Sequence, residues 1–344
     1  GSLFLVVSRQ LLLLGEMALF TPPKQNIPNE NEWMYVLIPT YISIITVLGF
    51  VLNVFVLMVF CLHKKASTVA EIYLTNLAAA DLFLMCFLPL WAVNVHNRFE
   101  ETLLKEFCTA FYVGIYMNAY CSIFFLVLVS VDRYLALVHP ISHESLRRPA
   151  YAKVACFCVW IMGFLLIIPL LVYKDVELGH GCSPKNQNAT TPVMIETKVF
   201  IGSFIIPIII ISFCTINILR ALRKRSKNDF NIKKSDSKAT TLILCVLLAF
   251  MICWIPYFLI QILEVLRESN ILTDQDFIEH LEICKQIFPC LAVFNSVLNP
   301  FLYVLVGKNF RKKAKELFLR QSNERGSTTG FASTRTYLTN SVRT

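Results

Sequence analysis

The sequence predicts an all-α membrane protein: a bundle of seven transmembrane helices followed by a short amphipathic helix on the membrane surface. Of 344 residues, 56% are hydrophobic and 16% are charged, whereas a soluble domain carries about 25% charged residues. The apolar residues form seven segments, each long enough to cross a bilayer at roughly 20 residues. Because lipid offers the backbone no hydrogen-bond partners, these segments are expected to be helices. Their predicted limits are 36–62, 71–96, 105–138, 152–173, 196–222, 238–266 and 280–306.

The chain before the first segment, residues 1–35, is expected to be a tail. Its apolar stretch is too short and interrupted to span a bilayer. Met17 has the look of a natural start, so residues 1–16 are interpreted either as an upstream extension or as a weak signal-like segment. Residues 36–306 then form the transmembrane domain.

Basic residues indicate which way the bundle crosses the membrane. Lys and Arg gather after the first, third, fifth and seventh segments, and such residues mark the cytoplasmic side. The N-terminal tail is therefore expected outside the cell, in a protein of the plasma membrane, and the net charge of +9 reflects topology rather than nucleic-acid binding. Residues 307–320 are predicted to form an amphipathic helix on the lipid of the inner leaflet. Residues 321–344 are predicted to be a disordered cytoplasmic tail.

Two features are predicted on the outer side. Between Glu264 and Glu282 there are six carboxylates and one basic residue, Arg267. They are either solvated loop charges or an attraction for a cationic ligand. Cys108 and Cys182 can form a disulfide in the oxidising exterior, and Asn188 lies in a glycosylation sequon.

Polar side chains inside the apolar segments are costly and are therefore candidates for function. Asp81 has no Lys or Arg nearby on its own segment, so it needs a partner, a proton or a cation. One interpretation is an interhelical hydrogen-bond network. The other is a sodium site, because hard cations prefer oxygen ligands. The residues expected around that ion are Asn118, Ser122, Asn295 and Ser296.

Asp132-Arg133-Tyr134 ends the third segment at the predicted cytoplasmic face. Arg133 keeps its proton in a protein, so it needs an anion or a carbonyl, unless it simply snorkels to water. Asp132 is one candidate partner, and Asp236 at the start of the sixth segment is the other. A pair with Asp236 would clamp the third and sixth segments and favour an inactive state.

The motifs of the seven segments, taken in order, resemble those of the rhodopsin-like G-protein-coupled receptors along most of the chain. They are Gly49…Asn53, Leu77-Ala78-Ala79-Ala80-Asp81, Asp132-Arg133-Tyr134, Trp160, Cys253-Trp254-Ile255-Pro256 and Asn299-Pro300-Phe301-Leu302-Tyr303. The resemblance implies a heterotrimeric G protein as a partner, and receptor kinases and arrestin through the Ser- and Thr-rich tail. It implies no cofactor beyond an allosteric sodium ion. The implied activation switch consists of Asp132, Arg133, Tyr134, Asp236, Trp254, Pro256, Asn299, Pro300 and Tyr303.

A narrower resemblance points to the bradykinin (kinin) receptors, with angiotensin receptors as the nearest rivals. It is carried by Phe60-Cys61-Leu62-His63-Lys64, Val69-Ala70-Glu71-Ile72-Tyr73-Leu74, Val131-Asp132-Arg133-Tyr134-Leu135-Ala136-Leu137-Val138 and Val306-Gly307-Lys308-Asn309-Phe310-Arg311-Lys312-Lys313. It implies a cationic peptide ligand and signalling mainly through the Gq class to phospholipase C and calcium.

The kinin resemblance also implies which residues bind the peptide. Glu264 and Glu282 match the family's acidic positions for the ligand's N-terminal cationic end, as directional arginine–carboxylate pairs. The deeper pocket is expected to be lined by Trp91, Tyr116, Tyr257, Phe258 and Gln261. Lys174 is the remaining predicted ligand-binding residue. Ordinary core packing is the alternative role for the aromatic residues.

The chain departs from the kinin pattern in two ways. Kinin receptors usually carry one cysteine in the N-terminal tail and another in the third outer loop. Here the first cysteine is Cys61, and Gln275 stands at the loop position, which is consistent with the loss of one bridge. Tyr116 stands where the subtype that prefers kinins without their C-terminal arginine has a lysine. Glu264 and Asp236-Ser237-Lys238 nevertheless resemble that subtype, so the sequence leaves the subtype open.

Two other classes of protein fit the sequence poorly. A secondary transporter would need repeats or broken half-helices, and no repeat is recognisable. An enzyme would need a cluster of catalytic or metal-binding side chains, but no His, Cys and Asp residues have the spacing of a metal site or a catalytic triad.

Overall fold

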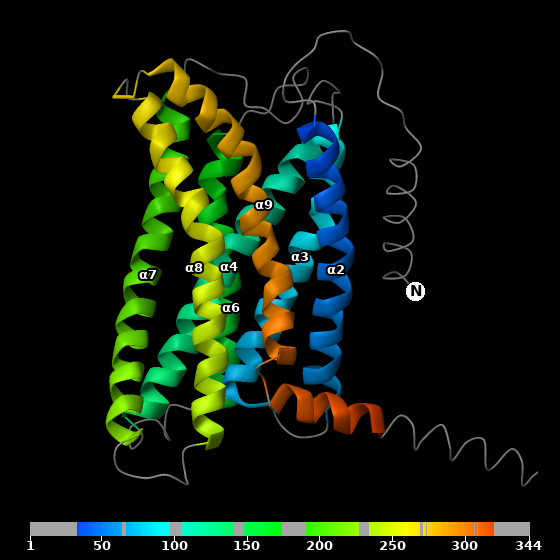
Figure 1. The fold of residues 1–344 in the computed structure, drawn as a ribbon, viewed down its shortest axis with the longest axis vertical. Helices are drawn as coiled ribbons and strands as arrows, with labels where there is room; N and C mark the ends of the chain where they lie inside the picture. Colours follow the sequence, from blue (N-terminus) through cyan, green and yellow to red (C-terminus); the bar gives the residue numbers. More distant parts are fainter. Residues whose placement is uncertain are drawn as a thin grey trace, which may run out of the picture.

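The computed structural model describes residues 33–319, with gaps at 64–66, 97–104, 140–147, 174–189, 227–233, 269–270, 273, 306 and 308. Within this part of the chain, seven helices are long and apolar enough to cross a membrane, and they stand side by side as a bundle (Figure 1). The predicted fold class is confirmed. The helices are α2 (Met34–Leu62), α3 (Val69–His96), α4 (Lys105–Val138), α6 (Pro149–Tyr173), α7 (Thr190–Ser226), α8 (Lys234–Glu268) and α9 (Gln275–Leu305).

Several helices run beyond their predicted limits. Helix α7 begins at Thr190 and ends at Ser226, although only Gly202–Ala221 is apolar enough to count as a span. Helix α9 begins at Gln275, five residues before the predicted start at position 280. Hydropathy reports contact with lipid, whereas helical hydrogen bonding continues into water. As a result, most of the acidic segment from Glu264 to Glu282 is helical rather than a loop.

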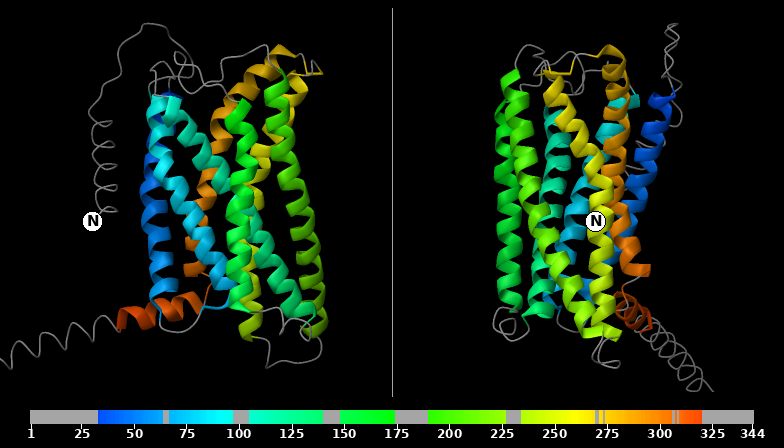
Figure 2. Two further views of the ribbon diagram at one scale, coloured as in Figure 1. Left: turned by 180° about the vertical axis from the view of Figure 1, so that it is seen from behind. Right: turned by 60° about the vertical axis from the view of Figure 1, so that its left-hand side comes forward.

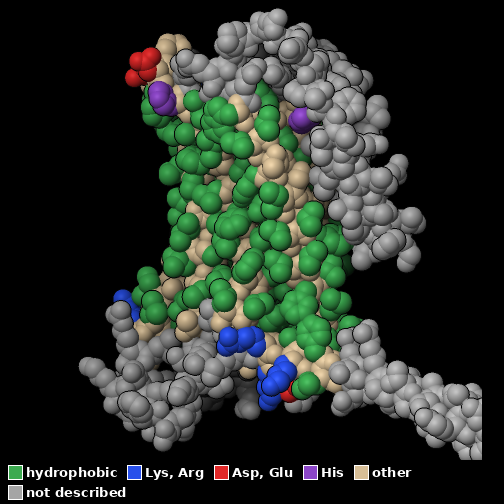
Figure 3. Space-filling model, turned by 45° about the vertical axis from the view of Figure 1, so that its right-hand side comes forward, with side chains coloured by type: hydrophobic (Ala, Val, Ile, Leu, Met, Phe, Trp, Pro, Cys, Tyr) green, Lys and Arg blue, Asp and Glu red, His purple; other side chains and the backbone are tan. Residues whose placement is uncertain are grey.

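Helix α4 is the central element of the bundle. It packs against α3, α6, α7 and α8, while α2 packs against α3 and α9, and α8 packs against α7 and α9. The views of Figure 2 show the same arrangement from two further sides. Apolar side chains face outward from the bundle, as Phe157, Ile161 and Phe164 do on α6. Figure 3 shows a broad hydrophobic surface on another face of the bundle.

The two ends of the bundle differ. A helix of residues 309–319 lies across one end, which we call the basic end because the blue Lys and Arg side chains of Figure 3 gather there. The predicted amphipathic helix is thereby confirmed. Its Phe310 is buried against Phe55, Phe60 and Tyr303, with ring centroids 5.4 to 6.1 Å away, whereas Phe318 and Leu319 are exposed. The opposite end, where α8 ends and α9 begins, is called the acidic end.

Glycine allows α4 to approach α3 closely. A Cβ atom at Gly114 would lie 2.5 Å from Cδ2 and 2.8 Å from Cβ of Phe87, so a side chain there would force the helices apart. Small residues serve this purpose in many membrane bundles. By contrast, a Cβ atom at Gly202 on α7 would meet nothing within 4 Å.

These two glycines give a matched test of the packing. Gly114→Ala should destabilise the protein by about 1–3 kcal/mol through overpacking. Gly202→Ala should be neutral or stabilising by up to about 1 kcal/mol, because alanine favours the helix. The apparent Tm of the purified protein in detergent measures both. Equal shifts in the two variants would contradict the close α3–α4 contact.

Candidate functional site

An aromatic cluster fills the bundle between α4, α7 and α8 on the way to the acidic end. Phe204 of α7 is its centre, with ring centroids 6.2 Å from Tyr120, 5.7 Å from Trp254 and 4.3 Å from Phe258. The members of the cluster are Tyr116, Tyr120, Phe204, Phe250, Trp254, Tyr257 and Phe258. Three of the predicted pocket residues, Tyr116, Tyr257 and Phe258, therefore lie together.

The other predicted pocket residues lie elsewhere or outside the description. Trp91 packs on Phe111, with ring centroids 5.9 Å apart, in a separate part of the core between α2, α3, α4 and α9. Lys174 and the side chain of Glu282 lie outside the described residues. Phe204 and Tyr120 are absent from the predicted set, because single aromatic residues within apolar segments carry no sequence signal for the side they face.

Glu264 lies at the acidic end with two cations on one of its oxygens. Its Oε2 is 3.2 Å from Nη2 of Arg267, three residues later on α8, and 3.2 Å from Nζ of Lys285 on α9. Its Oε1 is buried and has no hydrogen-bond partner among the described residues. Tyr257, Gln261 and Glu264 follow at spacings of four and three residues, so one side of α8 leads from the aromatic cluster to this carboxylate.

Lys285 is missing from the predicted site because it follows the acidic segment. It lies three residues after Glu282, so it lies on the same side of α9. This spacing is the one sequence signal that points to it. The acidic end is therefore less negative around Glu264 than the run of carboxylates predicts.

A polar core surrounds Asp81 at the centre of the bundle. Asp81 is fully buried; Nδ2 of Asn118 donates to its Oδ1 at 3.0 Å, and Nδ2 of Asn299 donates to its Oδ2 at 3.1 Å. A hydrogen-bond network thus joins α3, α4 and α9. Nδ2 of Asn53 adds α2 to this network by donating to the carbonyl of Ser296 at 3.0 Å.

The composition of this polar core fits a small hard cation. The hydroxyl of Ser122 and the amide of Asn295 are buried without hydrogen-bond partners in the described part of the chain, and no ion pair described there joins Asp81 to Lys or Arg. Oxygen ligands with one net negative charge are what such an ion requires. Across the described residues, no cluster of three or more His, Cys, Asp or Glu residues could hold a metal.

The Asp132-Arg133-Tyr134 motif lies in the last two turns of α4, at the basic end. Nη2 of Arg133 is 3.3 Å from Oδ2 of Asp132, which is one of the two predicted partners. The hydroxyl of Tyr134 is 3.1 Å from Nε2 of His139, and its ring packs on Phe213 of α7 at 5.7 Å. The side chain of Asp236 lies outside the described residues, so the predicted clamp stays a prediction.

The remaining switch residues lie on α8 and α9. Trp254 packs on Phe250 with ring centroids 5.7 Å apart, and its Nε1 is buried without a partner among the described residues. Tyr303 is buried near the basic end. Pro256 and Pro300 lie inside α8 and α9, where each removes a backbone donor.

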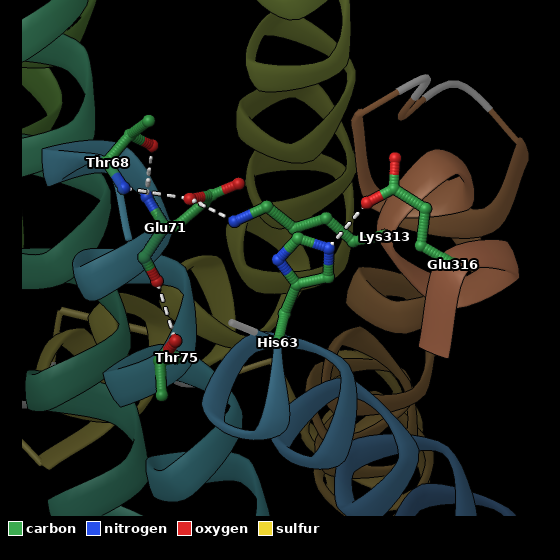
Figure 4. Close-up of polar contacts among 6 residues, drawn as sticks. All are labelled: His63, Thr68, Glu71, Thr75, Lys313 and Glu316. Carbon is green, nitrogen blue, oxygen red and sulfur yellow. Dashed lines mark hydrogen bonds and ion pairs between the residues drawn. The ribbon is translucent and has the colours of Figure 1, made fainter. Parts of the chain in front are cut away.

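An ion pair and a hydrogen bond hold helix 309–319 at the basic end (Figure 4). Nζ of Lys313 donates to Oε2 of Glu71 at 2.9 Å, and Oε2 of Glu316 is 2.8 Å from Nε2 of His63. The Lys313–Glu71 pair is largely buried, with side-chain exposures of 13% and 10%, whereas Glu316 is 39% exposed.

Glu71 also caps its own helix. The amide of Thr68 donates to Oε2 of Glu71 at 2.8 Å, and the amide of Glu71 faces Oγ1 of Thr68 at 3.4 Å. This reciprocal arrangement is a capping box, and its Thr-x-x-Glu pattern is readable in the sequence. The carboxylate of Glu71 therefore caps the N-terminus of α3 and also pairs with Lys313 of helix 309–319.

Several predicted sites lie outside the described part of the chain. These are Cys182, the side chain of Cys108, Asn188, and the tails at 1–32 and 320–344. The disulfide, the glycosylation and the tail functions stay predictions.

The chain matches the family described as 7 transmembrane receptor (rhodopsin family) over residues 52–303. It is 39% identical over 293 residues to the B2 bradykinin receptor of Homo sapiens, covering 83% of this chain and 75% of that protein. Identity to the B2 bradykinin receptor of Oryctolagus cuniculus is 38% over 296 residues, covering 84% and 80%. Identity to the B1 bradykinin receptor of Chlorocebus pygerythrus is 34% over 306 residues, covering 85% of each chain.

The docking of helix 309–319 can be tested by removing one charge at a time. Glu71→Gln keeps a side-chain acceptor for the capping box but leaves Lys313 without its carboxylate. Breaking a buried pair costs about 3 kcal/mol, so hydrogen exchange in residues 309–319 should become at least tenfold faster, a change of about 1.4 kcal/mol.

Glu316→Gln is the matched control, measured by the same exchange experiment in nanodiscs. Its partly exposed pair is screened by water and contributes less than about 1 kcal/mol, so exchange should rise much less. If Glu316→Gln loosened the helix as much as Glu71→Gln, the buried pair would not be the main attachment.

Proposed function

Because the chain belongs to the rhodopsin family of seven-transmembrane receptors, we propose that it binds a bradykinin-like cationic peptide outside the cell and activates a heterotrimeric G protein inside. A member of this family is a signalling receptor and not an enzyme, and within the family this chain is close to the bradykinin receptors. The observation that carries the proposal is similarity to both bradykinin receptor types over more than four-fifths of the chain.

The geometry of the acidic end supports a peptide ligand. A side chain entering between α4, α7 and α8 would meet the aromatic cluster, and a cationic end would meet Glu264 on the same side of α8. Aromatic surface and an arginine–carboxylate pair are typical anchors of a peptide. The plasma membrane, with the acidic end outside, is the location that this ligand requires.

Signalling is proposed to run mainly through the Gq class, with receptor kinases and arrestin acting on the C-terminal tail. Arg133 lies at the basic end, where a G protein would bind. A clamp between Arg133 and Asp236 in the inactive state is part of this proposal.

The ligand and the G protein can be tested together in one reconstitution. Purified receptor in nanodiscs should catalyse GTP exchange on an added Gq-class protein when bradykinin, or the form lacking its C-terminal arginine, is present. Comparing the two peptides assigns the subtype, and angiotensin is the control peptide. Exchange driven by angiotensin alone would favour the angiotensin alternative, and solute flux into proteoliposomes without exchange would favour a transporter.

A sodium ion is the second part of the proposal. Asp81 would hold it with oxygens of Asn118, Ser122, Asn295 and Ser296, and the ion would supply a positive charge that balances the buried carboxylate. An ion that binds one conformational state more tightly than the other shifts the populations toward that state, so sodium should change agonist affinity.

Asp81→Asn should abolish the effect of sodium on agonist affinity, measured by peptide binding in sodium and in N-methylglucamine buffers. Ser130→Ala is a suitable control, because Ser130 is a buried polar residue of α4 that donates to the carbonyl of Leu126 in its own helix. The control should keep the sodium effect. A sodium response that survives in Asp81→Asn would leave only the hydrogen-bond network at this position.

A further inference from the structure

We propose that Lys285 is an internal cation that occupies the carboxylate of Glu264 when no ligand is bound, and so sets the selectivity for peptides that differ in charge at their cationic end. The proposal rests on the proposed function, which brings a cationic peptide to this carboxylate. It assigns a role to a residue outside the predicted binding set.

The contacts of Glu264 are the first part of the argument. Nζ of Lys285 and Nη2 of Arg267 both lie 3.2 Å from the same oxygen, Oε2. The carboxylate is the least exposed of the three groups, at 12% of its side chain, against 28% for Arg267 and 31% for Lys285. A ligand that approaches from water therefore meets cations before it reaches the acid.

The second part of the argument is the charge that a ligand would add. Oε1 of Glu264 is buried and lacks a partner among the described residues, so it can accept one more donor. A ligand guanidinium there would be the third cation around a single carboxylate, and like charges a few Å apart repel strongly in a partly buried site. Binding is therefore favoured when one internal cation leaves.

Lys285 is the cation that can leave. Arg267 lies on the same helix as Glu264, three residues later, so the helix itself keeps the two side by side. Lys285 reaches across from α9 and carries a compact, strongly hydrated charge on a flexible stem. The side chain of Lys285 can rotate into solvent when a ligand guanidinium replaces it, because a guanidinium forms a bidentate contact with a carboxylate.

The competing role is that Lys285 positions Glu264 for the ligand. The two roles predict opposite changes in peptide affinity when Lys285 is replaced. A competitor weakens binding of a cationic peptide, so its removal strengthens binding. A positioning residue supports binding, so its removal weakens it.

The first experiment compares a kinin with the same peptide in which citrulline, a neutral isostere, replaces the N-terminal arginine. The quantity measured is the ratio of the two Kd values. Lys285→Met keeps most of the stem and removes the charge. It should raise the preference for the arginine peptide about tenfold, mainly by slowing dissociation, as expected for a close charge pair. In a Glu264→Gln background the same substitution should leave the ratio unchanged, since the shared carboxylate is gone.

Gln275→Glu is the matched control. It changes the net charge by the same amount as Lys285→Met, at an exposed residue of the acidic end that is not among the groups paired with Glu264. Exposed charges are screened beyond about 8 Å at physiological ionic strength, so the ratio should change less than about twofold. An unchanged or lower ratio in Lys285→Met, or an equal rise in Gln275→Glu, would overturn the proposal.

A second experiment needs no ligand. An amine-reactive acylating reagent, read by mass spectrometry, should label Lys285 several-fold faster in Glu264→Gln than in the wild type, while labelling of Lys315, exposed at the basic end, stays constant. Equal labelling of Lys285 would show that Glu264 does not hold it, and the proposal would fall. If the wild type bound neither peptide, the proposed kinin ligand would fail and its selectivity with it. An unchanged ratio with intact binding would reject only the role of Lys285.

Discussion

The structure depends on the cost of an unpaired polar group in the middle of a bilayer. Each helix satisfies its own backbone, so a buried polar side chain either bonds back to its own helix, as Ser130 does, or finds a partner on a neighbouring helix. Asp81 joins α3 to α4 and α9, Asn53 joins α2 to α9, and the indole of Trp160 on α6 donates to Oδ1 of Asn76 on α3 at 3.1 Å. These bonds fix distances and angles, and they concentrate on α2, α3, α4 and α9.

The contacts of Phe204 with α4 and α8 are of another kind. Phe204 meets Tyr120 of α4 and Trp254 of α8 through ring faces and edges at centroid distances near 6 Å. Aromatic pairs accept several geometries at similar energy, whereas a hydrogen bond weakens steeply when its angle changes. The bundle thus combines a polar-linked part with a part held by adaptable packing, and Pro256 lies inside α8 in the adaptable part. A peptide that contacts the aromatic cluster would act on the part of the bundle that yields more easily.

The number and order of the helices, and the helix at 309–319, could be predicted because the membrane imposes length and hydropathy on each segment. The polar core was predictable in part, because a carboxylate such as Asp81 in an apolar segment needs a hydrogen-bond partner, a proton or a cation. Contacts between helices were not predictable in the same way. Beyond the spacing of Lys285 from Glu282, nothing in the local pattern shows that Lys285 faces Glu264. Nothing shows that Lys313 reaches Glu71 or that Trp91 packs apart from Tyr116. Those contacts depend on how each helix rotates and tilts in the bundle, which is decided by packing such as that of Gly114 on Phe87.

The two ends of the bundle carry the same arrangement with different consequences. At each end a glutamate oxygen accepts a local donor and a lysine from a later helix: Glu71 with Thr68 and Lys313, and Glu264 with Arg267 and Lys285. Glu71 lies in the first turn of α3, where the helix dipole favours an anion and the capping box holds it. Glu264 lies near the end of α8, where the dipole favours cations and disfavours a carboxylate. Glu71 is therefore stabilised by its own helix as well as by Lys313, which suits a permanent attachment. Glu264 depends on neighbouring cations for its stability, and one cation can replace another there, which suits a site that exchanges partners.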